Sequence, residues 1–109
     1  MIIKKLNREH AIILCGHGSR DSDYQHEMNN LKIKLKQKFR CDVFNCFIEI
    51  NKPSIEDCIC EIIHRYQKIV FFPLLLFDGK HMIIDIKEKI NNVSEKFEKK
   101  IHLVSKVSL

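Results

Sequence analysis

His17 stands between two glycines, in the segment Gly16-His17-Gly18, immediately after the apolar run of residues 11–15. A neutral imidazole binds divalent metal ions, and it takes up a proton near neutral pH. Glycines on both sides indicate a backbone that must bring another group close to this histidine. His17 could also cap the following helix or merely occupy a turn. Its type and setting make it the first candidate for metal binding or proton transfer.

Two further reactive side chains follow apolar segments. Glu49 comes directly after Phe47 and Ile48, and His81 comes shortly after the apolar run that ends at Phe77. Taken alone, Glu49 could be a solvated strand end, and His81 could face solvent from the first turn of a helix. The other histidines follow no such segment, and we interpret them as surface residues: His10, His26, His64 and His102.

Two imidazoles and a carboxylate suit a borderline divalent metal such as Fe²⁺, Co²⁺, Ni²⁺ or Zn²⁺. A ligand set this small leaves coordination positions open, as a metal that reacts or is handed on requires, whereas structural sites are normally closed. The same groups can accept protons. We recognise no serine or cysteine nucleophile, and the turn at His17 matches neither a P-loop nor the dinucleotide-binding fingerprint.

The elements that must position these side chains alternate along the chain. Continuous apolar runs predict strands over residues 11–15, 43–48, 69–76 and 101–107. Apolar residues at spacings of three and four predict the intervening helices, over 21–39, from Pro53 as first helical position to Tyr66, and over 83–97 after a turn at Asp78-Gly79. Pairing is expected to loosen near Pro73, which cannot donate to the ladder.

This alternation predicts an α/β fold with a four-stranded parallel sheet and helices on both faces. At 109 residues the chain is long enough for one domain, which we assign to residues 1–109. Ligands of such sheets bind beyond the carboxyl ends of the strands. Because His17, Glu49 and His81 each follow a different strand, we expect them to converge at this edge.

Composition narrows the classes of partner. The longest apolar run has nine residues and no signal peptide is evident, so we expect a cytoplasmic protein that binds no membrane. Five cysteines without a CxxC pair are expected to be reduced and mostly buried. The formal charge of +5 comes without a nucleic-acid-binding module, so we expect no nucleic acid partner. A diffuse positive field would still attract a polyanionic small molecule.

Three blocks carry a resemblance to a known family. They are ILCGHGSR at 13–20, FIE with PSI close behind at 47–55, and PLLLFDGKH with DI following at 73–86. In this order they resemble the small class II chelatases, the sirohydrochlorin cobaltochelatases of cobalamin synthesis and their ferrochelatase and nickelochelatase relatives. The resemblance runs from about residue 11 to residue 90. It implies a chelatase-like fold and an enzyme that inserts a divalent metal into sirohydrochlorin, in cobalamin or sirohaem synthesis, with Co²⁺ favoured over Fe²⁺ and Ni²⁺.

The resemblance also assigns roles. It implies metal binding by His17 and His81, proton acceptance by His17, and participation of Glu49 in catalysis and substrate binding. The metal would be a substrate, with no permanently bound cofactor. The loop after the third strand would contact the tetrapyrrole through Leu76, Phe77, Asp78, Gly79 and Lys80. The carboxylates of sirohydrochlorin make nearby polar and cationic side chains reasonable partners: Ser19, Arg20, Lys52 and Lys80.

Small members of this family pair as homodimers, and we expect the same here. Members normally continue past the fourth strand into a final helix, which this sequence lacks, so we expect one sheet face to expose apolar surface. An alternative function is a metal or tetrapyrrole carrier without turnover. A phosphoryl-accepting role for His17 ranks low, because only Arg20 lies near enough in sequence to bind a phosphate.

Overall fold

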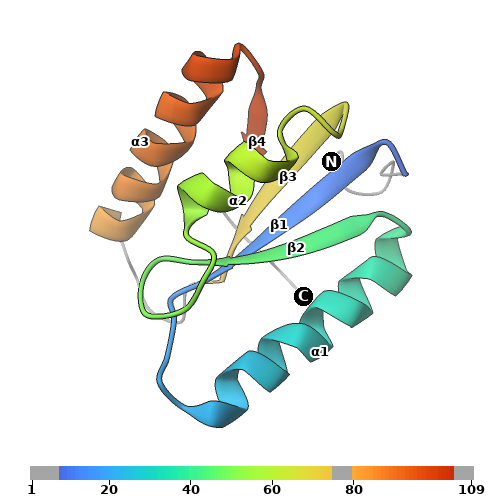
Figure 1. Ribbon diagram of the computed structural model, residues 1–109, viewed down its shortest axis with the longest axis vertical. Helices are drawn as coiled ribbons and strands as arrows, with labels where there is room; N and C mark the ends of the chain where they lie inside the picture. Colours follow the sequence, from blue (N-terminus) through green and yellow to red (C-terminus); the bar gives the residue numbers. More distant parts are fainter. Residues whose placement is uncertain (1–7, 75–79, 105–109) are drawn as a thin grey trace.

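A computed structural model describes residues 8–74 and 80–104, and in the first turn of the last helix, at residues 80–82, it describes the backbone alone. Within these residues four strands alternate with three helices, which confirms the predicted α/β class (Figure 1). In chain order the elements are β1 (His10–Gly16), α1 (Ser22–Phe39), β2 (Asp42–Phe47), α2 (Ile55–Ile62), β3 (Lys68–Pro73), α3 (Lys80–Phe97) and β4 (Ile101–Leu103).

The strands form one parallel sheet in the order β2-β1-β3-β4. β1 is therefore an inner strand, paired with β2 on one side and β3 on the other. Cys15 lies opposite Cys46 of β2 and opposite Pro73 of β3, so the three strands end at nearly the same level. The segments that follow them begin side by side at one edge of the sheet.

Helices cover both faces, as predicted: α1 lies on one side, and α2 and α3 lie on the other (Figure 1). Alternation along the strands divides the apolar residues between two cores. Ile13 and Phe71 pack in the core that α2 and α3 cover, whereas Leu14 and Phe72 pack in the core that α1 covers. The two inner strands, β1 and β3, are thus buried on both faces, which explains their continuous apolar sequences.

The second helix differs from its prediction at both ends. Pro53 precedes the helix instead of opening it, because its carbonyl accepts a hydrogen bond from Phe47 N at 2.9 Å and keeps the segment extended. Ser54 is the N-cap, and its Oγ accepts from Asp57 N at 3.1 Å. The helix ends at Ile62. Tyr66 lies beyond the helix end, where its side chain is buried and its hydroxyl donates a hydrogen bond to Asp42 Oδ2 at 2.5 Å.

Two strands are shorter than predicted. β3 ends at Pro73, where the missing N–H stops regular pairing, although Leu74 N still donates to Cys15 O at 2.7 Å. β4 ends at Leu103. The rest of its predicted span, together with the turn at Asp78-Gly79, extends beyond the described residues.

The expected exposure of an apolar sheet face is wrong for β3. Val70 and Phe72, which lie on the α1 side of the sheet, are only 1% and 5% exposed. The exposed large apolar side chains in the described ranges 8–74 and 83–104 are instead Ile33, Ile50 and Ile84, on two helices and one loop. None of the helices in these ranges is both long and apolar enough to cross a membrane.

Candidate functional site

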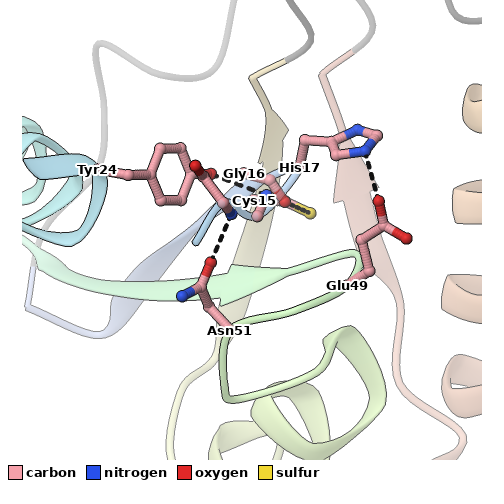
Figure 2. Close-up of polar contacts among 8 residues, drawn as sticks. Cys15, Gly16, His17, Tyr24, Glu49 and Asn51 are labelled. Atoms are coloured by element: carbon pink, nitrogen blue, oxygen red, sulfur yellow. Dashed lines mark hydrogen bonds and ion pairs between the residues drawn. The ribbon is translucent and has the colours of Figure 1, made fainter. Parts of the chain in front are cut away.

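The structure brings His17 and Glu49 together at the carboxyl edge of the sheet. His17 directly follows β1, and its Nε2 lies 2.9 Å from Oε1 of Glu49 (Figure 2). Glu49 follows β2, as predicted, but because the strand ends at Phe47 and not at Ile48, Glu49 lies two residues beyond it. The side chains are 46% and 58% exposed, so both groups remain open to a ligand from solvent.

The backbones that carry this pair are also joined. Ile48 N donates to Gly16 O at 3.0 Å, and Glu49 N donates to His17 O at 3.1 Å. These bonds continue the contact between the two chain segments for two residues beyond β2 and one residue beyond β1. Because the main chains at His17 and Glu49 are connected directly, the distance between their side chains depends on few free torsions.

The two glycines beside His17 are explained by close contacts within the protein. A Cβ on Gly16 would lie 2.1 Å from the Tyr24 hydroxyl, and a Cβ on Gly18 would lie 1.9 Å from the Glu49 carbonyl oxygen. Gly18 also has a φ of +109°, which side chains of L residues rarely adopt. The glycines therefore let the His17 loop approach α1 on one side and the Glu49 loop on the other.

Two residues that the sequence did not single out for the site hold this loop. Gly18 N donates to the Tyr24 hydroxyl at 3.0 Å, and Ser19 N donates to Asn51 Oδ1 at 2.7 Å (Figure 2). Tyr24 falls within the helix predicted over residues 21–39, where its position is that of an ordinary helical residue. Asn51 gave no signal, because its partner is 32 residues away and its type is common in turns.

The predicted residues nearer the end of the chain are described only in part. Lys80 and His81 lie in the first turn of α3, as the sequence predicts for His81. Their side chains lie outside the described part of the structure, as do four whole residues of the predicted substrate loop: Leu76, Phe77, Asp78 and Gly79. The roles predicted for these residues stay predictions.

Comparison with known proteins identifies the family. The CbiX family model matches residues 11–108, which is most of the chain. This chain belongs to the CbiX family. A sirohydrochlorin cobaltochelatase of Sulfolobus acidocaldarius is 33% identical over 87 residues, 79% of this chain and 70% of that protein. A second sirohydrochlorin cobaltochelatase, from Methanococcus aeolicus, is 31% identical over 80 residues, 72% of this chain and 56% of that protein.

The fold of the CbiX family is also found in a solved structure. It comes from Marinobacter aquaeolei VT8 and carries the description cobalamin (vitamin B12) biosynthesis CbiX protein. Its TM-score to this chain is 0.72 at 22% identity, with 88% of this chain and 80% of that chain covered. At this identity the likeness confirms the chelatase-like fold of this CbiX chain and says nothing further about its site.

Beneath the site of this CbiX chain lies a group of buried thiols. Cys15, Cys46 and Cys58 are all nearly or fully buried, in agreement with the expectation that the cysteines are reduced and mostly inside; Cys60 is exposed. Hydrogen bonds with Cys15 and Cys58, together with burial, raise the pKa of the Cys46 thiol. Since a thiol must lose its proton to bind a metal well, Cys46 is suited to packing.

Within the described residues, which do not include the side chain of His81, no three histidine, cysteine, aspartate or glutamate side chains lie close enough together to hold a metal ion. Among the remaining histidines, His26 and His64 are exposed as predicted, whereas His10 and His102 are half-buried. Burial, and then the charges of Lys68 and Lys100, lower the pKa of His102. His102 therefore favours its neutral form. It lies on β4, which β3 separates from β1 in the sheet (Figure 1).

The close approach at Gly18 leads to a test of the site's architecture. Gly18→Ala places a methyl group against the Glu49 carbonyl and forces a positive φ on alanine, so we expect a loss of about 1–3 kcal/mol in unfolding free energy. Urea denaturation followed by circular dichroism measures this loss. Lys52→Ala, an exposed change in the neighbouring loop, is the control and should stay within about 0.5 kcal/mol of the wild type. Equal stability of the two variants would contradict the close approach.

Proposed function

We propose that this chain is a metallochelatase that inserts a divalent metal ion into sirohydrochlorin, with Co²⁺ favoured, in cobalamin biosynthesis. The observation that carries the proposal is the contact of 2.9 Å between His17 Nε2 and Glu49 Oε1 at the open carboxyl edge of the sheet. Membership of the CbiX family and the names of the two curated relatives support the substrate and the metal. Fe²⁺ or Ni²⁺ as the metal, and sirohaem as the product pathway, remain alternatives within the same chemistry.

Metal insertion requires both a metal site and a proton acceptor. A tetrapyrrole releases two pyrrole N–H protons as the divalent ion takes their place, so the net charge of the macrocycle is unchanged and two protons must be accepted nearby. An ionised carboxylate can only accept hydrogen bonds, so the contact with Glu49 requires His17 to donate from Nε2. In the neutral imidazole this leaves Nδ1 with its lone pair. We assign metal binding, and then proton acceptance, to that atom.

Glu49 acts on this imidazole in two ways. Its carboxylate fixes the tautomer of His17, as carboxylates commonly do for histidines that bind metals. It also stabilises the imidazolium that forms when Nδ1 takes a pyrrole proton. Because the Glu49 side chain is itself 58% exposed, its second oxygen can accept the other pyrrole proton and release it to solvent.

His81 completes the proposed metal site. It lies in the first turn of α3, which follows β3, the strand next to the one that carries His17. Two histidine ligands from neighbouring strands would leave positions for water and then for pyrrole nitrogens. For the carboxylates of the substrate we propose contacts with Ser19, Arg20, Lys52 and Lys80, in a protein whose formal charge is +5.

We further propose that the protein works as a cytoplasmic homodimer. The four buried free cysteines fit a reducing compartment. The exposed Ile84, on the helix that begins beside the site, offers an apolar contact for a second copy.

We expect light scattering at micromolar concentration to give twice the monomer mass of 13.0 kDa, and Ile84→Lys to shift the molecule toward the monomer. A wild type that is entirely monomeric would contradict the dimer.

Substitution of His17 and Glu49 tests the mechanism. We expect His17→Ala to abolish insertion of Co²⁺ into sirohydrochlorin, and Glu49→Gln, which keeps the shape but loses the charge, to slow it about a hundredfold. Anoxic assays follow the absorbance change of the tetrapyrrole, with Co²⁺, Fe²⁺ and Ni²⁺ compared. His26→Ala, on the exposed side of α1, is the matched histidine control. Wild-type rates of insertion in a folded His17→Ala variant would contradict the mechanism. If the wild type binds sirohydrochlorin without any change in its absorbance, the protein is a carrier and not a chelatase.

Metal binding alone tests the two-histidine site. We expect anaerobic Co²⁺ titration to show moderate affinity in the wild type and at least tenfold weaker binding in both His17→Ala and His81→Ala, since each removes one of two ligands. Affinity should fall as pH falls, because imidazole must be neutral to bind a metal. If His81→Ala binds Co²⁺ as tightly as the wild type, His81 is not a ligand.

A further inference from the structure

The loop that carries Glu49 contains a strained turn. Asn51 N donates to Glu49 O at 2.7 Å, so the turn closes over a single residue, Ile50, whose φ is +69°. A hydrogen bond between residues two apart around a positive φ is a γ-turn of the rare, strained type. A β-branched residue is among the least suited to this conformation. The Ile50 side chain is 54% exposed and gains little from burial.

Contacts on both sides of Ile50 hold this turn in place, and both lead to the His17 loop. On one side, Glu49 N donates to His17 O at 3.1 Å. On the other side, Asn51 Oδ1 accepts from Ser19 N at 2.7 Å (Figure 2). The first bond belongs to the backbone and is available to any residue at position 49. The second depends on the side chain of Asn51.

We propose that Asn51 is a positioning residue that locks the strained turn and so holds the Glu49 carboxylate against His17. Without Oδ1 the turn loses its tie to Ser19, and Ile50 can relax to a negative φ. The main chain that carries Glu49 then rotates, and the Nε2–Oε1 contact opens. The catalytic consequence rests on the function proposed above, whereas the effect on the geometry of the pair does not.

Tyr24 provides a matched comparison. Its hydroxyl accepts from Gly18 N at 3.0 Å, so it binds the same loop through the same kind of bond, and its ring lies 6.0 Å from that of Phe47. Within the described part of the chain, neither this hydrogen bond nor this ring contact reaches the Glu49 turn. Loss of the Tyr24 hydroxyl therefore removes one hydrogen bond from the His17 loop without releasing Ile50.

The first experiment needs neither metal nor substrate. The ring ¹⁵N resonances of His17, assigned by their absence in His17→Ala, report which nitrogen carries the proton. At a pH where the imidazole is neutral, we expect the wild type and Asn51→Asp, which keeps the accepting oxygen, to show a single tautomer protonated at Nε2. Asn51→Leu should show a mixture of tautomers, whereas Tyr24→Phe should resemble the wild type. A wild-type tautomer pattern in Asn51→Leu overturns the proposal.

The second experiment measures insertion. We expect Asn51→Leu to lower kcat about tenfold to a hundredfold, as for a small misplacement of a catalytic group, with KM for sirohydrochlorin within about twofold of the wild type. The same change made in Glu49→Gln should have almost no further effect, because the carboxylate it positions is already lost. Equal fold-losses in both backgrounds overturn the proposal.

A third variant covers the case in which Asn51→Leu does not fold. Glycine adopts a positive φ without strain, so Ile50→Gly combined with Asn51→Leu should fold and recover the single His17 tautomer. A mixture of tautomers in this folded double variant contradicts the lock. If the wild type inserts no metal while Asn51→Leu alters the tautomer pattern, the function proposed above fails and the positioning role of Asn51 stands.

Discussion

The pairing of β1 with β2 continues beyond both strands, and the candidate site depends on this continuation. Two backbone hydrogen bonds, from Ile48 N to Gly16 O and from Glu49 N to His17 O, extend the contact of the two main chains from the strand ends into the loops. They fix two main chains whose side chains would otherwise have to find one another across flexible segments. The fixed geometry requires a glycine at position 18, because any larger residue would collide with the Glu49 carbonyl. A pair organised in advance in this way needs little rearrangement to bind a metal or take a proton.

The sequence was sufficient to predict the parts of the structure that follow from periodicity. Continuous apolar runs placed three strands within a few residues of their observed ends, and the edge at which His17 and Glu49 meet follows from parallel topology alone. The prediction that Pro53 is the first helical residue was wrong, because a tertiary hydrogen bond from Phe47 N holds Pro53 outside the helix. Local propensity contains no information about such a bond. The contribution of Asn51 was missed for the same reason, since its value lies in a partner that is distant in sequence.

The glycines beside His17 show how a correct inference from sequence can have an unexpected cause. Their presence predicted that some group must come close to the histidine. That group turned out to be the protein itself, the Tyr24 hydroxyl at Gly16 and the Glu49 carbonyl at Gly18. The space freed by the missing side chains is filled by protein atoms that stiffen the loop. A glycine-rich motif of this kind therefore makes the site rigid, although glycine itself is the most flexible of residues.

The strand order gives the edge of the sheet a further property. After β1 the chain turns toward the face covered by α1, and after β3 it turns toward the opposite face, covered by α3 (Figure 1). The winding of the chain thus reverses between two neighbouring strands, and sheets of this kind bind their ligands at such a reversal. The segments that leave on either side lead to His17 and to the first turn of α3. A flat molecule that enters between these two segments would face the His17 loop on one of its surfaces and the first turn of α3 on the other.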